Sequence, residues 1–597
     1  MKRNRLQKAA GVLMALIMLL SLCVTAQAAE IRVIWNYRYE ILKDGSAKIL
    51  EFRGKDTDVV VPAELEGHPV TEIGDKAFYQ KRSLNSINLP DGVKKIGNRA
   101  FNGCDSLTSV ALPNTLTYIG NRAFANCKSL HSLRIPTSIQ ELGENPFALC
   151  DNLTTLYIYD QHPLFEMRDN ALIGKTDQRL ICYLPSAQDS TYRIPDGVEI
   201  IGKSAFAGCR QLTSVEIPDS VTAIEESAFG QCDGLTEMVL PPKLDRIGSK
   251  AFQDCDSLTS MVIPASVTQI NGNPFVGCDQ LTSLTVEEGN PAYEYEIGVL
   301  YDRKNEILVS YLNANMMDEY TVPDDIRTIG SNAFESVACL KKVTVPEGVT
   351  AIGDFAFSNC RGLVSIDLPD SVTSIGIWAF ESCVSLESAV LPPKMTTLSE
   401  SMFNRCEGLQ EVTLPDALTT LGAGAFAGCK ALKEVKLPKG VTVVGSSAFA
   451  GCDLLESVTL PDELMTLGAG AFSGCVSLKQ IKLPMTLGIL SDSLFENCAS
   501  LESIRIPINV RTIGAYCFSG CSSLTSITVP EGVTTLRKYA MAKCENLVDV
   551  TLPKSVNHIG FGLFQGGSLK LVVKAYKGTY AYRYCVDEAV VEVEPIE

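Results

Sequence analysis

The sequence has few of the residues on which most catalytic sites depend. Its 597 residues include four histidines and two tryptophans. No histidine lies in an HExxH zinc motif, and the chain has no GxSxG nucleophile elbow. Cys517 and Cys521 have CxxxC spacing, but no histidine is near enough in sequence to complete a metal site. The sequence therefore predicts a protein that is not an enzyme and that needs no metal or cofactor.

Basic residues are also scarce relative to acidic ones. The chain has 52 Lys and Arg against 69 Asp and Glu, a formal net charge of −17. No stretch of the sequence concentrates basic residues after the N-terminus, so we expect no nucleic-acid partner and no attraction to anionic membrane surfaces. The plainest interpretation of the acidic excess is that it favours solubility of a long protein with an apolar core.

Long apolar runs are confined to the N-terminus. Residues 1–28 combine four basic residues, an apolar core from about residue 9 to residue 24 and the cleavage pattern Ala26-Gln27-Ala28, which together predict a secretory signal peptide. A membrane anchor, or a lipoprotein modified at Cys23, is the weaker interpretation, because the apolar core is short and the large Leu22 precedes Cys23. We expect a secreted or loosely surface-associated protein with no integral membrane span once the signal is removed.

Phenylalanine marks a 23-residue period along most of the chain. Eighteen of the 22 phenylalanines fall on this period, which defines 19 units. The marked positions are Phe78, Phe101, Phe124 and Phe147, then Phe206, Phe229, Phe252 and Phe275, then every 23rd residue from Phe334 to Phe564, with Met541 replacing one phenylalanine. A fixed period of this length is typical of a solenoid, in which each unit is one turn stacked on the next.

One unit, residues 107–129, illustrates the predicted turn. Residues 107–112 have the LxxLxL spacing of a short strand with one buried face, and Pro113 ends it because proline has no N–H for a neighbouring strand. Residues 116–119 form a second short apolar run, and residues 123–127 have the spacing of one helical turn, α or 3₁₀. We predict a β-rich α/β solenoid: a right-handed coil of about 19 turns with a buried phenylalanine spine.

The glycine four residues before each phenylalanine is not expected to need a positive φ. Gly120 is typical, but Glu225 and Arg537 are among five residues that replace it. Because glutamate and arginine rarely adopt a left-handed conformation, we expect tight but ordinary backbone at this position.

Sixteen of the 21 cysteines lie three residues after the marked phenylalanines. Stacked equivalent residues would lie roughly 4.8 Å apart with parallel Cβ atoms, wider than the usual separation of about 3.5–4.5 Å between the Cβ atoms of a disulfide. Blocks of three and nine cysteines would also each leave one unpaired. We expect a ladder of buried free thiols, with cysteine as a small apolar filler.

Both ends of the chain and two interruptions depart from the period. Residues 29–72, with a hairpin signal at Asp44-Gly45, predict an N-terminal cap, and residues 568–597 a mixed cap with a short helix from about Thr579. The two interruptions lengthen the intervals 147–206 and 275–334 by the same amount, and their sequences are copies of each other. The predicted parts are 1–28, 29–72, repeats 73–157, insert 158–195, repeats 196–285, insert 286–323, repeats 324–567 and 568–597.

Each insert is predicted to be a hairpin, and its role is open. Asn-Pro-Phe precedes both, at 145–147 and 273–275. The hairpin can pair onto the sheet and continue the coil, or it can project as a contact element, in which case Tyr293 and Tyr295 are candidates for binding.

The repeat LTSVEIPDSVTAIEESAFGQC, residues 212–232, resembles the unit of the BspA-type leucine-rich repeat proteins, a bacterial and protist branch of the leucine-rich repeats. The resemblance covers about residues 30–597. It implies a curved or twisted β-rich solenoid and a secreted or surface-exposed protein in an adhesion or host-contact role. The family has no common catalytic site, so the resemblance assigns no catalytic residue.

The candidate binding surface is the row of outward positions on the first strand of each repeat. Small hydroxyl side chains make a flat face suited to an extended protein partner, although serine and threonine also simply suit exposed strand positions. The candidates are Ser109, Ser214, Glu216, Ser260, Glu434, Lys436, Lys482 and Arg505. We expect an extracellular protein or cell-surface ligand, with a structural spacer or self-assembling surface-layer component as the alternative.

Overall fold

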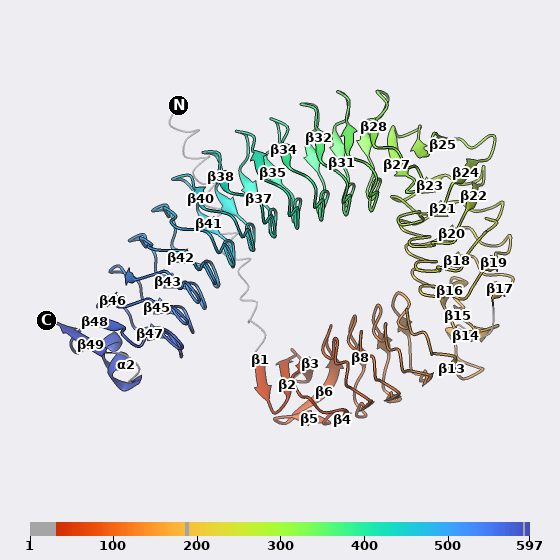
Figure 1. Cartoon of the computed structure of the whole chain (residues 1–597). Coiled ribbons are helices and arrows are strands. Elements are labelled where there is room, and N and C mark those ends of the chain that lie inside the picture. Colours follow the sequence, from red (N-terminus) through yellow and green to blue (C-terminus); the bar gives the residue numbers. More distant parts are fainter. Residues whose placement is uncertain (1–30, 185–189, 589–591) are drawn as a thin grey trace, which may run out of the picture. The chain divides into compact units, whose positions relative to one another are not determined.

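The structure is a computed structural model of the whole chain, and it describes residues 31–184, 190–588 and 592–597. The predicted signal peptide, residues 1–28, lies outside the described residues. The chain divides into two compact units, Met1–Gly234 and Leu235–Glu597. Each unit is a solenoid of parallel strands that recur with the period of the sequence, so the predicted fold class is confirmed (Figure 1).

In the first unit, every complete turn contributes one strand to each of two parallel ladders. Before the first insert, the strands of the first ladder are β4 (Asp58–Val60), β7 (Ser86–Asn88), β9 (Ser109–Ala111), β11 (Ser132–Arg134) and β13 (Thr155–Tyr157), and β17 (Thr191–Arg193) and β19 (Ser214–Glu216) follow it. Those of the second are β6 (His68–Ile73), β8 (Lys95–Ile96), β10 (Tyr118–Ile119) and β12 (Glu141–Leu142). Partners in each ladder are one repeat apart, as in the pair Ile119 and Leu142. The pair β4 and β7 is the exception to this spacing. Asp58 pairs with Ser86, and the connection between the two strands is longer than one repeat.

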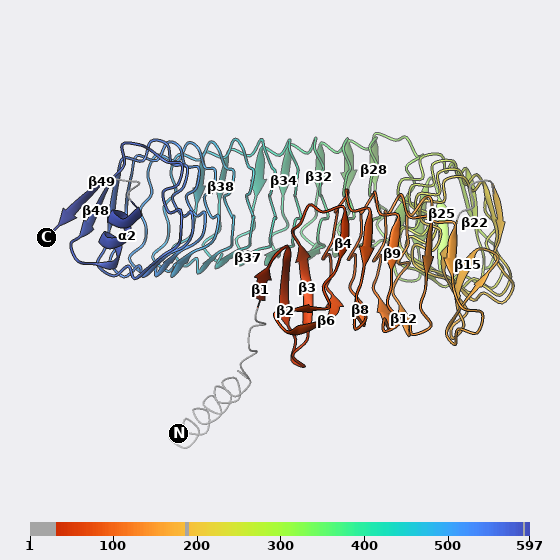
Figure 2. The same ribbon diagram turned by 90° about the horizontal axis from the view of Figure 1, so that it is seen from below.

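The N-terminal cap is already the first turn of the coil. Strands β1 (Ile31–Ile34), β2 (Tyr37–Ile41) and β3 (Ala47–Phe52) form an antiparallel sheet, and β3 pairs in parallel with β6 (Figure 2). Phe52 stacks on Phe78 with ring centroids 5.1 Å apart. The cap therefore covers the open end of the core with a turn of the same geometry.

The second unit repeats the two ladders. Its first ladder includes β28 (Glu319–Thr321), β30 (Lys342–Thr344), β32 (Ser365–Asp367), β34 (Ser388–Val390), β36 (Glu411–Thr413), β38 (Glu434–Lys436) and β40 (Ser457–Thr459). Its second ladder includes β29 (Thr328–Ile329), β31 (Ala351–Ile352), β33 (Ser374–Ile375), β35 (Thr397–Leu398), β37 (Thr420–Leu421), β39 (Val443–Val444) and β41 (Thr466–Leu467).

The phenylalanines form a stacked spine inside each unit. From Phe334 to Phe518, successive rings lie 4.8–5.8 Å apart and within 10° of parallel, and Phe426 is fully buried. Offset stacking at this distance adds to the burial of each ring. The buried spine predicted from the period is confirmed.

The segment around each phenylalanine is not the helical turn that its spacing predicts. Arg122 and Asn126 have φ of 50° and 58°, and the residues between them form hydrogen-bonded turns. Phe124 N–H donates to Pro146 O at 2.8 Å in the next turn of the coil. A helix would direct its N–H groups along its own axis, whereas here they must bond to the neighbouring turn. Gly120 has no positive φ, as predicted; a Cβ there would lie 2.7 Å from Asn98 N.

The cysteines have a hydrogen-bonding role that the sequence pattern did not indicate. All 20 described cysteines are free, and Cys339 alone among them is not fully buried. Cys452 Sγ donates to Phe426 O at 3.2 Å, and the same bond recurs from turn to turn. A weak thiol donor thus satisfies a carbonyl inside the coil in most turns that carry a cysteine of the ladder. Burial raises the pKa of Cys475 and of Cys544 to about 12.

The last strand of each insert continues the second ladder. In the first insert, β14 (Phe165–Arg168), β15 (Ala171–Gly174) and β16 (Arg179–Tyr183) are antiparallel, and β16 pairs in parallel with β18 (Ile200–Ile201). In the second, β25 (Tyr293–Glu296), β26 (Val299–Asp302) and β27 (Ile307–Tyr311) repeat this arrangement, and β27 pairs with β29. Tyr183 stacks on Phe206 at 5.2 Å and Tyr311 on Phe334 at 5.3 Å, in the place of a phenylalanine.

A mixed cap ends the second unit. Strand β48 (Val572–Tyr576) pairs in parallel with β46 (Asp549–Leu552) and with β49 (Glu592–Ile596), and helix α2 (Tyr580–Glu588) lies beside them (Figure 1). The helix begins one residue after the predicted Thr579. No helix among the described residues combines the length and hydropathy that a membrane span requires.

Candidate functional site

Seven of the ten predicted binding residues are exposed, and five of these lie on strands of the first ladder. Glu434 and Lys436 lie at the outward positions of β38 and are paired in register with Ser457 and Thr459 of β40. In the first unit, Ser109 on β9 is exposed. The other residues of this set are Glu216 and Ser260, which are exposed, and Ser214, which is half-buried. We call these outward positions of the first ladder the strand face.

Two predicted residues lie where the ladder is irregular. Lys482 and Arg505 are exposed, but their segments have no assigned strand. Lys482 Nζ lies 3.5 Å from Asp462 Oδ1, and both side chains are more than four-fifths exposed. An ion pair this exposed contributes little to stability, so both charges stay accessible.

Tyr293 does not offer a contact surface, contrary to the prediction. The residue is 6% exposed, and its hydroxyl accepts a hydrogen bond from Ile270 N at 2.6 Å. Its role is to satisfy a peptide group at the edge of strand β23 (Gln269–Ile270), because no strand among the described residues pairs with that edge. Tyr295 is half-buried on the same strand, β25.

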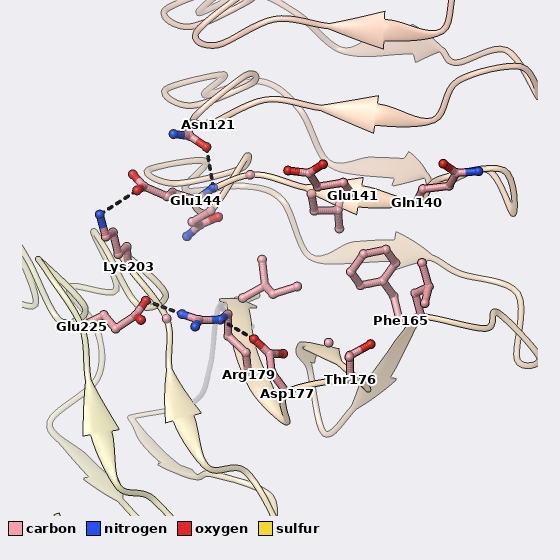
Figure 3. A pocket seen from close by; sticks show the side chains of 17 residues that line it. Asn121, Gln140, Glu141, Glu144, Phe165, Thr176, Asp177, Arg179, Lys203 and Glu225 are labelled. Atoms are coloured by element: carbon pink, nitrogen blue, oxygen red, sulfur yellow. Dashed lines mark hydrogen bonds and ion pairs between the residues drawn. The ribbon is translucent and has the colours of Figure 1, made fainter. Parts of the chain in front are cut away.

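The first insert borders a cavity of about 570 Å³ that sequence reasoning did not find. It lies between β12 and the sheet of β14, β15 and β16 (Figure 3). Its apolar wall includes Leu142, Leu164, Phe165 and Ile181, and its polar wall includes Gln140, Glu141, Glu144, Asp177, Arg179, Lys203 and Glu225.

Asn145 joins the two turns of the coil that flank the first insert. Its Nδ2 donates to Ser204 O at 2.6 Å, across the whole insert, and its Oδ1 accepts from Phe147 N at 3.1 Å. The side chain therefore links the turns before and after the insert, while the antiparallel strands β14, β15 and β16 join only the second ladder. Asn273 makes the same bonds to Asn332 O and from Phe275 N in the other copy. The Asn-Pro-Phe motif thus joins turns around an insert.

Two ion-pair networks organise the polar wall of the cavity. Arg179 Nε donates to Asp177 Oδ2 at 2.8 Å and its guanidinium also bonds to Glu225 (Figure 3). Burial opposes the charge of Arg179, but these partners outweigh it and raise the pKa of the guanidinium. Lys203 Nζ lies 2.7 Å from Glu144 Oε1, and this bond raises the pKa of Lys203. With four carboxylates and two cations, the cavity carries an excess of negative charge.

The cavity is lined by carboxylates, cations and apolar side chains. Its lining contains no histidine, cysteine or serine that could act as nucleophile or general base. Across the described residues, no group of three or more His, Cys, Asp or Glu side chains is placed to hold a metal ion. The arrangement can supply charge, hydrogen bonds and an apolar wall to a ligand.

One phosphate-loop pattern does occur in the sequence, GVEIIGKS at residues 197–204, and the structure gives it another role. A phosphate loop follows a strand and opens a helix. Here β18 lies within the motif, and a turn of the coil follows it. Lys203 is paired with Glu144 and Glu226, and the N–H of Ser204 donates to Glu226 O. The residues of this pattern belong to the repeat unit itself, so the resemblance to a phosphate loop does not indicate phosphate binding.

Comparisons with known proteins agree with the geometry. A family profile described as "BspA type Leucine rich repeat region (6 copies)" matches residues 71–175, 185–295, 327–455 and 442–570. The fold is thus that of a leucine-rich repeat protein. The chain belongs to the BspA-type leucine-rich repeat family. A search of curated proteins found no match.

Several solved bacterial structures are similar to this chain. A leucine-rich repeat protein from Eubacterium ventriosum is 23% identical, with 75% of this chain and 95% of that one covered and a TM-score of 0.39. One from Bacteroides ovatus is 20% identical, with coverage of 95% and 100% and a TM-score of 0.34. A leucine rich cell surface protein from Faecalibacterium prausnitzii is 26% identical, with coverage of 76% and 95% and a TM-score of 0.28.

Proposed function

We propose that the protein is exported and acts outside the cell without catalysis, binding another extracellular protein or a cell-surface ligand through its strand face. Adhesion or contact with host or neighbouring cells is the function that this surface serves. The observation that carries the proposal is the exposed, in-register row of side chains on the first ladder of the second unit, where each turn adds an equivalent pair of positions.

The chemistry of this row supports a protein partner. Between Glu411 and Arg505 the outward positions carry small hydroxyl, charged and amide side chains, with Lys436 exposed next to Thr459. The small hydroxyl side chains of this face lose little side-chain entropy on binding, and the face offers hydrogen bonds at the regular spacing of an extended chain. Large aromatic platforms, which sugar ligands require, are missing from the outward positions of β36, β38 and β40.

Reversing the charges of the strand face is expected to reduce binding to cells. The variant Lys436→Glu, Lys482→Glu and Arg505→Glu changes three exposed cations, and rim charges of this kind mainly alter association rates. We expect about threefold to tenfold less cell-bound protein for this variant. The measurement uses the purified fluorescent chain on epithelial cells and on bacteria. Added salt should reduce the binding of the original chain more than that of the variant.

A control variant carries two charge reversals away from the strand face. Lys394→Glu and Lys439→Glu alter exposed lysines in the turns after the strand-ending prolines, and this variant should bind as the original chain does. Equal binding by the strand-face and control variants would contradict the proposed surface. Concentration-dependent lattices without any cell binding would instead indicate the structural role.

A further inference from the structure

The edge of β12 that faces the cavity has peptide groups without a partner. Glu141 N–H donates to Thr117 O at 3.2 Å and Gly143 N–H donates to Ile119 O at 2.8 Å, both toward β10. Because peptide groups alternate sides along a strand, the N–H and carbonyl of Leu142 point away from β10. Within the described residues no strand pairs with this edge, and the N–H of Leu142 has no hydrogen-bond acceptor.

The second copy of the insert closes the same edge with a tyrosine. Ile270, which stands in the second copy where Leu142 stands in the first, donates its N–H to the Tyr293 hydroxyl at 2.6 Å. The residue equivalent to Tyr293 in the first copy is Phe165, which lines the cavity and has no hydroxyl. Since the two copies share a common arrangement of strands, the open edge of β12 follows from this one difference in side chain.

The charges of the cavity are also confined to the first copy. Its four carboxylates and two cations all have uncharged residues at the equivalent positions. Glu141, Glu144, Asp177, Glu225, Arg179 and Lys203 correspond to Gln269, Gly272, Asn305, Gly353, Ile307 and Ser331. Five of the six form ion pairs with one another, whereas Glu141 is exposed and has no ion pair among the described residues.

We propose that this cavity binds an extended segment of a partner protein that carries a lysine or arginine side chain. The segment adds as a strand to the open edge of β12: Leu142 N–H donates to a carbonyl of the segment, and the Leu142 carbonyl accepts an N–H from it. The basic side chain pairs with Glu141 under the negative charge of the cavity. Alternate side chains of the segment contact Phe165 and Ile181. The site is separate from the strand face and does not depend on the function proposed for that surface.

A peptide library tests the proposal. Fluorescein-labelled, acetylated and amidated heptapeptides, randomised at three central positions, are passed over the immobilised purified chain. We expect enrichment of peptides that combine a central lysine or arginine with β-branched or apolar neighbours. Hydrogen exchange should then show that an enriched peptide slows exchange of the Leu142 amide.

Two substitutions copied from the equivalent positions 128 residues later separate the contributions of the backbone edge and of the charge to peptide binding. Phe165→Tyr supplies the hydroxyl that closes the edge, so binding should fall about tenfold while the Leu142 amide becomes protected without peptide. Glu141→Gln should weaken lysine-bearing peptides about twofold to fivefold and leave serine-bearing counterparts unchanged. Tyr293→Phe, the matched change in the other copy, should leave peptide binding as it is.

Three results would overturn the proposal. They are no enrichment over the starting library, enrichment of acidic peptides, or unchanged binding when Phe165→Tyr has protected the Leu142 amide. Competition with lysine amide or spermidine distinguishes a strand from a small cation: if either displaces the peptides at equal concentration, pairing with the β12 edge is wrong. Because Phe165 and Glu141 lie off the strand face, loss of cell binding by the strand-face variant neither supports nor contradicts this site.

Discussion

Replacing Phe426 with alanine is expected to lower the free energy of unfolding by about 3–5 kcal/mol. The ring is fully buried and lies 5.6 Å from the ring of Phe403 and 5.4 Å from that of Phe449. Alanine would leave a cavity that neighbouring turns cannot fill, because each turn is held by hydrogen bonds to the turns on both sides. Urea unfolding followed by circular dichroism measures the change.

Phe561 provides the control for this substitution. Its side chain is 60% exposed and lies outside the spine, with its ring 4.9 Å from that of Tyr539. Phe561→Ala should cost less than about 1 kcal/mol, as is usual for exposed positions. A urea midpoint for Phe426→Ala that matches the original chain would contradict the claim that stacked rings hold adjacent turns together.

Raising the pH above about 8.5 is expected to destabilise the protein steeply, because the buried thiols must stay protonated in the folded state. Burial raises the pKa of Cys475 and Cys544 to about 12 in the folded chain, whereas unfolded cysteine ionises near 8.5. The stabilisation from each such group is complete below about pH 8.5 and is lost as the pH rises toward 12, at about 1.4 kcal/mol per pH unit for each cysteine.

The variant Cys475→Ala isolates one thiol from the lysines and tyrosines that also titrate in this range. Urea unfolding at intervals from pH 7.5 to pH 10.5 should give a dependence on pH that is shallower for the variant by about 1.4 kcal/mol per unit above pH 8.5. Identical slopes for the two proteins would mean that the Cys475 thiol is not held in its neutral form by folding.

The buried parts of the fold could be predicted from the sequence because each turn uses the same side chains. The period of Phe426 and its equivalents indicates a shared interior, and the LxxLxL spacing predicts a strand. The conformation around Phe124 could not be predicted in the same way. Residues 123–127 have helical spacing, but bonds between neighbouring turns decide the backbone, and the positive φ of Arg122 and Asn126 leaves no sequence signature.

The open edge and the charges of the cavity beside the first insert arise from differences between the two copies of the insert and its flanking repeats. The repeat pattern showed that the inserts are copies, and Asn145 marked the start of the first. The β12 edge stays open because Phe165 lacks the hydroxyl that Tyr293 has at the equivalent position. The Tyr293 hydroxyl accepts its hydrogen bond from Ile270, a full repeat away in sequence, so the difference could not be read from neighbouring residues. Burial of Tyr293 itself could not be read from its residue type, since tyrosine suits both exposed and buried positions.

The sequence pattern could locate the strand face, but it could not tell which of its residues bind a partner and which have only a structural role. Serine and threonine at outward positions suit any exposed strand, so Ser109 and Ser260 carry no signal that separates binding from structure. Glu434 and Lys436 are more informative. These two opposite charges lie on the exposed face of one strand and do not contribute to the packing of the core.

The most direct test of the account is a count of reactive thiols with Ellman's reagent, without reductant, before and after denaturation. For the 20 described cysteines, between Cys104 and Cys585, the account predicts little reaction in the native protein, with the half-buried Cys339 the most reactive. In guanidinium chloride all 20 should react. Extensive reaction in the native state, or a large shortfall after unfolding, would contradict a fold in which each unit buries a ladder of free thiols beside its phenylalanine spine.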